Sequence, residues 1–497
     1  MTVDVKSVYQ VSEVEVAKTS PWKAFILKHN SYYYVLDEYC KTAGTRSSLP
    51  EAVEKASELL SEGREWRERI VINCYCILED TVRLPNYVEL VIEGLIKAPD
   101  GFNKPMFDIS GLKEVSLKGT GIIDGNRSGQ SADMDGVYAS ESVEKIKISG
   151  LKFRGFTRSA IRIKATEWSR EVDVTDCVFE NCPHPVHLFL VEQYSIDCNF
   201  FNLNLESGHT VFADICRKGS ISLNRVYGGD INLRVAGAEE VVIANNVIRG
   251  ETESPTGGGG ITVVGASRQV DVVGNVVSNK PMEGIEFAQV DYCQAVGNML
   301  IKCAQGGFKC WDFRHCRISE NMVIDCGFVE AYGDSQYPIS ASIILYSSDG
   351  AHSTHHDVVE DNIIIFTGEK RAADYAVAEA RLAGEVDYNI IRRNHIFGEP
   401  AIGPLHIVGE HTIVKDVSGY KTENGGTATF SGDGSTTQFT IPHELAKAPT
   451  NVVLEPMTAD ASKPHYVTWD DSYIYVHFLE APPAGVDNVK FSWIAKC

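Results

Sequence analysis

The sequence predicts an all-β fold in which a parallel β-helix, a solenoid of stacked coils, follows a capping helix and precedes an antiparallel β-sandwich. The main observation is a motif that occurs four times in residues 241–326, as VVIANNVIRG, VDVVGNVVSN, CQAVGNMLIKC and CRISENMVIDC. Its asparagines are Asn246, Asn275, Asn298 and Asn321, and the last two steps are 23 residues long. A period of about 20 to 30 residues with short β-branched runs and no helical pattern is typical of a solenoid. The other two observations are a lone helical pattern before the coils and short alternating strands after them.

The motif continues before and after this stretch. The equivalent positions are Leu151, Cys177, Asn199, Asn224, Asn362 and Asn394. The steps between neighbouring positions range from 22 to 41 residues, so we expect coils of nearly constant strand length joined by turns of variable length. An asparagine at each turn can hydrogen-bond its own neighbours and the asparagine one coil away. We therefore interpret these asparagines as structural.

The segment before the coils is predicted to contain a β unit and a helix. Residues 1–45 hold two apolar runs around His29, Asn30 and Ser31, which indicates a hairpin. Residues 46–69 contain the helical pattern at 48–61, with Ser47 or Ser48 as cap, Pro50 in the first turn, and an apolar face of Ala52, Val53, Ala56, Leu59 and Leu60. We expect this helix to cover the open end of the coils, whose strand edges would otherwise pair with other chains.

The coils are predicted over residues 70–417, and the composition changes after them. SGYKTENGGT at 418–427 is rich in turn-forming residues and is interpreted as a linker. Residues 428–497 contain six or seven short alternating runs separated by turn clusters, such as TQFTIPH and YIYVHFL. This pattern predicts a small antiparallel β-sandwich.

Composition and charge narrow the classes of function. The chain has 497 residues, 43% of them hydrophobic, which is enough for a long core and appended domains. A formal net charge of -21 argues against a nucleic-acid partner, because phosphate binding needs a basic surface, and it makes a polyanionic glycan harder to bind. No apolar run follows Met1, so we expect no signal peptide and no membrane insertion.

The 13 cysteines do not indicate a disulfide framework. Cys293 and Cys316 keep the 23-residue step, as do Cys303 and Cys326. Cysteines at equal coil positions are expected to stack as small core residues.

Three sequence stretches resemble known families. GTGIIDGN at 119–126 is similar to the glycine-rich turn of early coils in the pectin-lyase-like superfamily, and the coil pattern extends the resemblance over roughly residues 70–417. Within that superfamily the chain resembles the tailspike-like proteins of viruses, since GDGSTTQFTIPH and PPAGVDNVKFSW are similar to β-sandwich modules of viral tail proteins. The resemblance implies a right-handed parallel β-helix and a homotrimer. It implies no single reaction, because the superfamily includes lyases, hydrolases, epimerases and adhesins.

Counting back from the asparagines predicts which side chains face outward on one sheet. Positions eleven and thirteen before each asparagine are apolar or small, so positions ten and twelve before it are expected outside. The outer strip defined in this way consists of His187, Phe189, Phe212, Asp214, Arg234, Ala236, Val263, Gly265, Glu286, Ala288, Lys309 and Trp311. Aromatic residues at both ends with charges between them suit an extended sugar site. The alternative is a solvated face on which opposite charges of adjacent strands pair.

Glycoside hydrolysis needs two carboxyl groups about 5 to 9.5 Å apart. Asp214 and Glu286 are three coils apart, roughly 14 Å at a rise of about 4.8 Å per coil, so they do not form a simple pair. We expect Glu286 to act with Asp312 of the next coil, with Glu283 and Asp291 as substitutes. The predicted catalytic residues are therefore Glu286, Asp312 and Asp214, and the predicted substrate-binding residues are His187, Phe212, Arg234, Lys309 and Trp311.

Other chemistries remain as alternatives. β-Elimination would need a base, for which Arg234, Lys309 or His187 is available. The insertion SSDGAHSTHHDVVED contains Asp349, His352, His355, His356 and Asp357, residue types that bind transition metals, but it also has the composition of a polar loop. No helix sets the spacing of these side chains, so we expect no metal and no cofactor.

The leading hypothesis is a viral tailspike-like protein of the virion tail that binds a host surface polysaccharide and depolymerises it, by hydrolysis in preference to elimination. Other virion tail proteins would then be partners, and release would follow host lysis. The alternatives are a non-catalytic glycan-binding adhesin of the same fold and a cellular polysaccharide lyase, hydrolase or epimerase.

Overall fold

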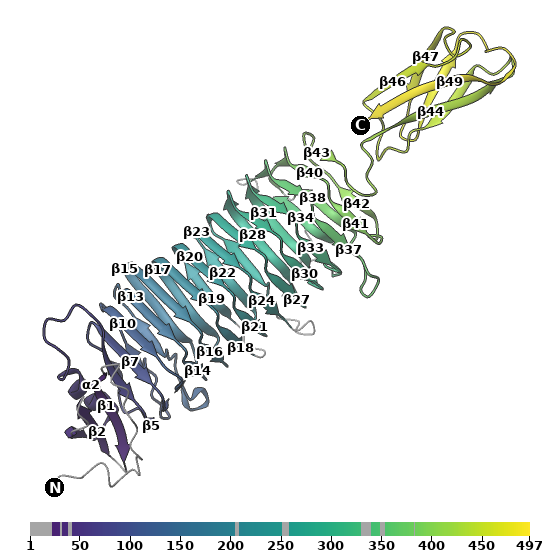
Figure 1. Cartoon of the computed structure of the whole chain (residues 1–497). Coiled ribbons are helices and arrows are strands. Elements are labelled where there is room, and N and C mark those ends of the chain that lie inside the picture. Colours follow the sequence, from purple (N-terminus) through teal and green to yellow (C-terminus); the bar gives the residue numbers. More distant parts are fainter. Residues whose placement is uncertain are drawn as a thin grey trace. The chain divides into compact units, whose positions relative to one another are not determined.

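The computed structural model describes residues 22–29, 32–37, 42–203, 208–250, 258–329, 339–347, 353–381 and 383–497. The chain divides into two compact units, Met1–Glu206 with Thr210–Gly219, and Ser207–His209 with Ser220–Cys497. Each unit contains coils of parallel strands, and Figure 1 shows strands from successive coils lying side by side. The predicted parallel β-helix is confirmed. Within the described ranges, no helix is long and apolar enough to cross a membrane.

The first unit begins with a β unit and one helix. β1 (Trp22–His29) pairs antiparallel with β2 (Tyr32–Asp37), and β2 pairs antiparallel with β3 (Thr42–Arg46). β1 also pairs with the first coil strand, β4 (Glu68–Ile72), so this unit continues the sheet of the coils. The predicted turn residues Asn30 and Ser31 lie outside the described residues.

The helix α2 (Leu49–Ser57) is shorter than the predicted span of 48–61. Ser48 is the N-cap, and its Oγ accepts a hydrogen bond from the backbone N–H of Glu51. The apolar face buries Leu49, Ala52, Val53 and Ala56, and Leu60 is buried in the turn that follows, whereas Leu59 is half-buried. The Ser57 hydroxyl donates to the carbonyl of Val53, a local bond that competes with continuation of the helix.

The coils of the first unit consist of three rows of parallel strands. The first row comprises β6 (Val82–Arg83), β9 (Phe107–Asp108), β12 (Val137–Ala139), the first parts of β15 (Ser159–Thr175) and β17 (His184–Asp197), and β19 (His209–Asp214). The second comprises β4, β7 (Val88–Ile92), β10 (Lys113–Lys118), β13 (Glu144–Ser149) and the second parts of β15 and β17. The third comprises β5 (Tyr75–Ile77), β8 (Leu95–Lys97), β11 (Ile122–Asp124), β14 (Lys152–Arg154), β16 (Val178–Glu180) and β18 (Phe200–Asn202).

The coils of the second unit repeat these rows; β20 (Arg217–Ser222) contains the sequence boundary between the units. Row one comprises β22 (Ile231–Ala236), β25 (Ile261–Val264), β28 (Glu283–Asp291), β31 (Gly306–Arg314), β34 (Ala341–Ser347), β38 (Tyr375–Arg381) and β42 (Gly403–His406). Row two comprises β23 (Glu239–Ala244), β26 (Arg268–Val273), β29 (Gln294–Val296), β32 (Arg317–Ser319), β36 (Val358–Glu360), β40 (Ile390–Arg392) and β43 (Ile413–Lys415). Row three comprises β21 (Arg225–Tyr227), β24 (Val247–Arg249), β27 (Val276–Ser278), β30 (Met299–Ile301), β33 (Met322–Ile324), β37 (Ile363–Ile365) and β41 (His395–Phe397). Two short strands, β35 (Thr354–His355) and β39 (Val386–Asp387), pair beside row one.

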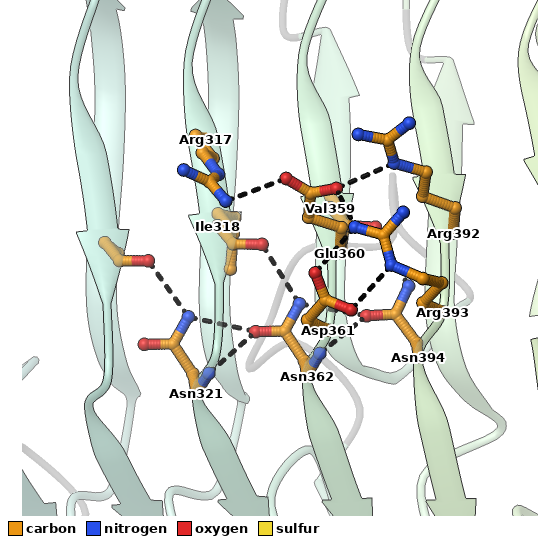
Figure 2. A network of polar contacts seen from close by, with 11 residues as sticks. Arg317, Ile318, Asn321, Val359, Glu360, Asp361, Asn362, Arg392, Arg393 and Asn394 are labelled. Atoms are coloured by element: carbon orange, nitrogen blue, oxygen red, sulfur yellow. Dashed lines mark hydrogen bonds and ion pairs between the residues drawn. The ribbon is translucent and has the colours of Figure 1, made fainter.

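The asparagine ladder is confirmed and lies in the core between rows two and three. Asn298 is 1% exposed; its Nδ2 donates to the carbonyl of Val272 and to Oδ1 of Asn321, and its own Oδ1 accepts from the backbone N–H and the Nδ2 of Asn275. Figure 2 shows the same bonds joining Asn321, Asn362 and Asn394. The amide groups therefore satisfy backbone groups at a corner where the strand ladders are interrupted.

An ion network lies beside the ladder on the surface of row two. Glu360, only 4% exposed, accepts from Arg317, Arg392 and Arg393, and Arg393 also contacts Asp361 (Figure 2). The three cations offset the cost of burying the carboxylate, because a buried charge needs paired partners.

The cysteines are stacked as predicted. All twelve cysteines among the described residues are free thiols, and ten of them are buried. The backbone N–H of Cys293 points to Sγ of Cys316, and that of Cys303 points to Sγ of Cys326. The column that contains Cys293 and Cys316 continues with an aspartate, because the backbone N–H of Cys316 donates to Oδ1 of the buried Asp357. Burial raises the pKa of the Cys316 and Cys326 thiols.

The C-terminal strands form the predicted antiparallel β-sandwich of two three-stranded sheets. One sheet contains β44 (Glu423–Gly432), β49 (Gly485–Lys496) and β46 (Asn451–Pro456), and the other β45 (Gln438–Pro442), β48 (Tyr473–Phe478) and β47 (His465–Trp469). Phe439, Ile474, Val476, Phe491 and Trp493 are among the residues of their shared core. β44 begins at Glu423, so part of the expected linker at 418–427 is strand.

Candidate functional site

The outer strip in the second unit lies on row one, with two corrections. Arg234, Thr262, Glu286 and Lys309 are aligned on successive strands. Val263, predicted to face outward, is fully buried in the core, and its neighbours Thr262 and Val264 align with the strip instead, with Thr262 only 3% exposed. The count was wrong in this coil because three residues separate β25 from β26, whereas two separate β22 from β23. Ala288, also predicted to lie outside, is 1% exposed and is paired with Trp311.

Glu286, Lys309 and Trp311 come together on β28 and β31. Glu286 is paired in register with Lys309, and the indole Nε1–H of Trp311 donates to Glu286 Oε1 at 3.1 Å. The Trp311 ring also stacks on Tyr346 of β34, with ring centroids 6.3 Å apart. A carboxylate, a cation and a flat ring are therefore adjacent on one half-buried surface, and together they offer hydrogen bonds and a stacking surface to a sugar.

Glu283 lies at the start of β28 and is only 2% exposed. It is paired with Gly306, and a Cβ on Gly259 of the preceding coil would lie 3.0 Å from Glu283 Oε1, so Gly259 makes room for this carboxyl group. Burial and the charge of Glu286 raise the pKa of Glu283 to about 7, and the opposing effect of Lys309 is smaller. No described group hydrogen-bonds Glu283 Oε2. A carboxyl group that keeps its proton near neutral pH beside a second carboxylate is the arrangement of a general acid and its partner.

Asp312 has different surroundings from Glu286. It is 2% exposed, has a positive φ of 52°, and lines a pocket of about 190 Å³ together with Gln289, Asp291 and Arg314. Glu286 does not line this pocket. The left-handed backbone at Asp312 turns the side chain away from the alternation of the strand, which a count of sequence positions could not show.

The remaining predicted residues lie on row one of each unit. In the first unit His187 stacks on Phe212, with centroids 4.8 Å apart, and Asp214 is half-buried and paired with Phe189. In the second unit Nη1 of Arg234 lies 3.0 Å from Nε2 of His209.

A second cluster lies at the corner that follows row one of the second unit. The nitrogen atoms of His315, His355 and His356 that could bind a metal all lie within 4.8 Å of one another. Burial and the neighbouring rings of His356 and His315 lower the pKa of His355. Asp349 and His352, which the sequence grouped with this cluster, lie outside the described residues, and Asp357 belongs to the buried cysteine column.

Sequence reasoning named Glu283 only as a substitute and missed His315. The signal for Glu283 was the glycines of neighbouring coils, Gly259 and Gly306, at a position where other strands carry side chains. His315 lies 40 residues before His355, so that only the coil register brings the two together.

These strands and corners define a right-handed parallel β-helix protein with a cluster of acidic, basic and aromatic side chains on one outer sheet. No protein-family model matches the chain, and no curated protein matches it. Among solved structures, the chain is similar to a tailspike protein variant of Escherichia coli bacteriophage HK620 in complex with a hexasaccharide, with 13% identity, a TM-score of 0.55, and coverage of 90% of this chain and 88% of that one. It is also similar to the A-module of the mannuronan C-5 epimerase AlgE6 of Azotobacter vinelandii, with 15% identity, a TM-score of 0.50, and coverage of 75% and 96%. These likenesses confirm the fold.

Proposed function

We propose that the chain is a tailspike-like protein that binds a host surface polysaccharide and depolymerises it by glycoside hydrolysis. The observation that carries the proposal is the pair of Glu283 and Glu286, a buried carboxyl group with a raised pKa next to a carboxylate on an outer sheet. In this proposal Glu283 protonates the leaving oxygen and Glu286 acts as the nucleophile, because the two carboxyl groups interact directly and leave no room for a water between them. Trp311 and Lys309 bind the sugar beside them. The tailspike neighbour that carries a hexasaccharide supports the substrate class and the virion location, and the trimeric state is part of the same proposal.

The test is release of new reducing ends from surface polysaccharides of candidate bacterial hosts. We expect Glu286→Gln and Glu283→Gln each to abolish the release without loss of glycan binding, because an amide keeps the volume and removes the acid–base function. Trp311→Ala should instead weaken binding.

Asp312→Asn is the matched control, because it changes the carboxylate that the sequence paired with Glu286. If activity survives Glu286→Gln but not Asp312→Asn, the active site is the pocket that Asp312 and Gln289 line, and not the pair of Glu283 and Glu286. Binding without any release by the wild type would support the non-catalytic adhesin, and unsaturated uronide products would indicate elimination.

A further inference from the structure

The corner after row one carries a column of stacked rings. Tyr292 stacks on His315, His315 on His356, His356 on Tyr388, and Tyr388 on His411, with centroid separations of 5.0, 5.6, 5.4 and 4.6 Å and interplanar angles of 18° or less. Four of the five residues, all except His411, have φ between 53° and 60°. Four successive coils therefore make the same left-handed turn, and each places its ring over that of the coil before it.

His355 joins this column from the side. Consecutive residues of a strand point to opposite faces, but the left-handed backbone of His356 brings the two side chains to the same surface. Their Nδ1 atoms are 2.7 Å apart, and the ring of His355 is nearly perpendicular to those of His315 and His356, at 89° and 85°. His355 is also paired in register with Arg314, which places His315 next to it.

Asp291 orients the third histidine. Its Oδ1 lies 3.0 Å from Nδ1 of His315, and its other oxygen is bound by Arg314 at 3.3 Å. A carboxylate that accepts from Nδ1–H leaves the lone pair of Nε2 free, which is how an outer carboxylate commonly orients a metal-binding histidine. His315 and His356 both line an open pocket of about 650 Å³, so an ion has access from solvent.

We propose that His315, His355 and His356 bind a divalent transition-metal ion of the zinc class, through Nε2 of His315 and the facing nitrogens of His355 and His356. Imidazole nitrogens are preferred ligands of such ions, and a tetrahedral site with bonds of about 2.0–2.1 Å needs its nitrogens about 3.3 Å apart. The observed separations, from 2.7 Å to within 4.8 Å, bracket that value, so small ring rotations suffice. Three protein ligands leave the fourth position to water or to a ligand atom. The ion would join two successive coils.

The test is titration of chelator-treated protein with Zn²⁺ by calorimetry, and with Co²⁺ by visible absorption. We expect one site per chain that His315→Ala and His355→Ala each remove, and that Asp291→Asn weakens by about 10- to 100-fold. His411→Ala is the matched control: its Nδ1 contacts Asp387 at 2.7 Å in the same column, yet it is not one of the three ligands. It should bind Zn²⁺ like the wild type.

Three results would contradict a metal site at these histidines. In the first, the wild-type protein binds no Zn²⁺, and in the second, the histidine variants bind it as tightly as the wild type. In the third, the Co²⁺ spectrum is dominated by thiolate charge transfer, which would show that cysteine binds the ion. Circular dichroism of each variant separates loss of the site from loss of the fold.

Discussion

At the scale of single residues, the proposed acid at Glu283 has a consequence for stability. Its folded pKa of about 7 lies above its ordinary value of 4.5, so the folded chain holds a proton that the unfolded chain has released between these two values. The stability that this group contributes is therefore present below about pH 4.5 and is lost as the pH rises through 7, by about 3 kcal/mol in total.

Glu283→Gln should remove this pH dependence. We expect its thermal midpoint to exceed that of the wild type at pH 8 and the difference to shrink at pH 5, measured by circular dichroism. Glu239→Gln, at an exposed position on β23, should show no such difference between the two pH values. A wild-type protein whose stability does not fall between pH 5 and 8 relative to Glu283→Gln would contradict a protonated Glu283.

Lys280 is another buried ionisable residue, and unlike Glu283 it was not singled out by the sequence. Its Nζ donates to the carbonyls of Gly229 and Asp230 and to Oδ1 of Asn232. Burial lowers its pKa to about 8. A lysine between Asn279 and Pro281 looks like a surface residue in the sequence. Its burial could not be predicted, because the acceptors that bind it come from residues some 50 positions earlier.

At the scale of elements, the asparagine ladder is what the sequence predicted best, because its hydrogen bonds repeat with the coil and so appear as a period. The row-one surface was predicted less well. Inward and outward alternation, counted from the asparagine, fails where a corner gains a residue, as after β25, and where a strand residue adopts a left-handed backbone, as Asp312 does. Contacts between coils depend on loop lengths, and the sequence shows those lengths but not the register that they produce.

Loss of one ladder position should destabilise the coils. Asn298→Ala removes the partners of the carbonyl of Val272 and the backbone N–H of Asn275, and each buried group left unpaired costs about 1–3 kcal/mol. We expect a clearly lower midpoint in denaturant unfolding.

Asn245→Gly is the control for that variant. Asn245 precedes a ladder asparagine, is exposed, and has a φ of 55°, which glycine adopts freely. It should change the midpoint little. Equal effects of the two substitutions would show that the ladder contributes no more than any turn asparagine.

At the scale of the whole molecule, the trimer is the prediction that follows from exposed apolar side chains. Leu223, Val242 and Val247 on the second unit are 56%, 40% and 41% exposed in the single chain. Side-by-side association with two further chains would cover such residues. Light scattering at micromolar concentration should return roughly three times the chain mass of 54.7 kDa. A mass equal to that of one chain would contradict a trimer. The substitution Val242→Glu places a charge among these exposed apolar side chains and should shift a trimer towards monomer.

The ladder also makes coils interchangeable. Asn275 and Asn298 occupy the same place in successive coils and make the same bonds to their neighbours, so the 23 residues that follow Asn275 form a complete module whose two ends are equivalent. Duplication or excision of such a segment in a gene would leave every remaining amide with a partner. A protein built in this way can lengthen its outer sheets one coil at a time, while the side chains of any one coil change independently of the rest.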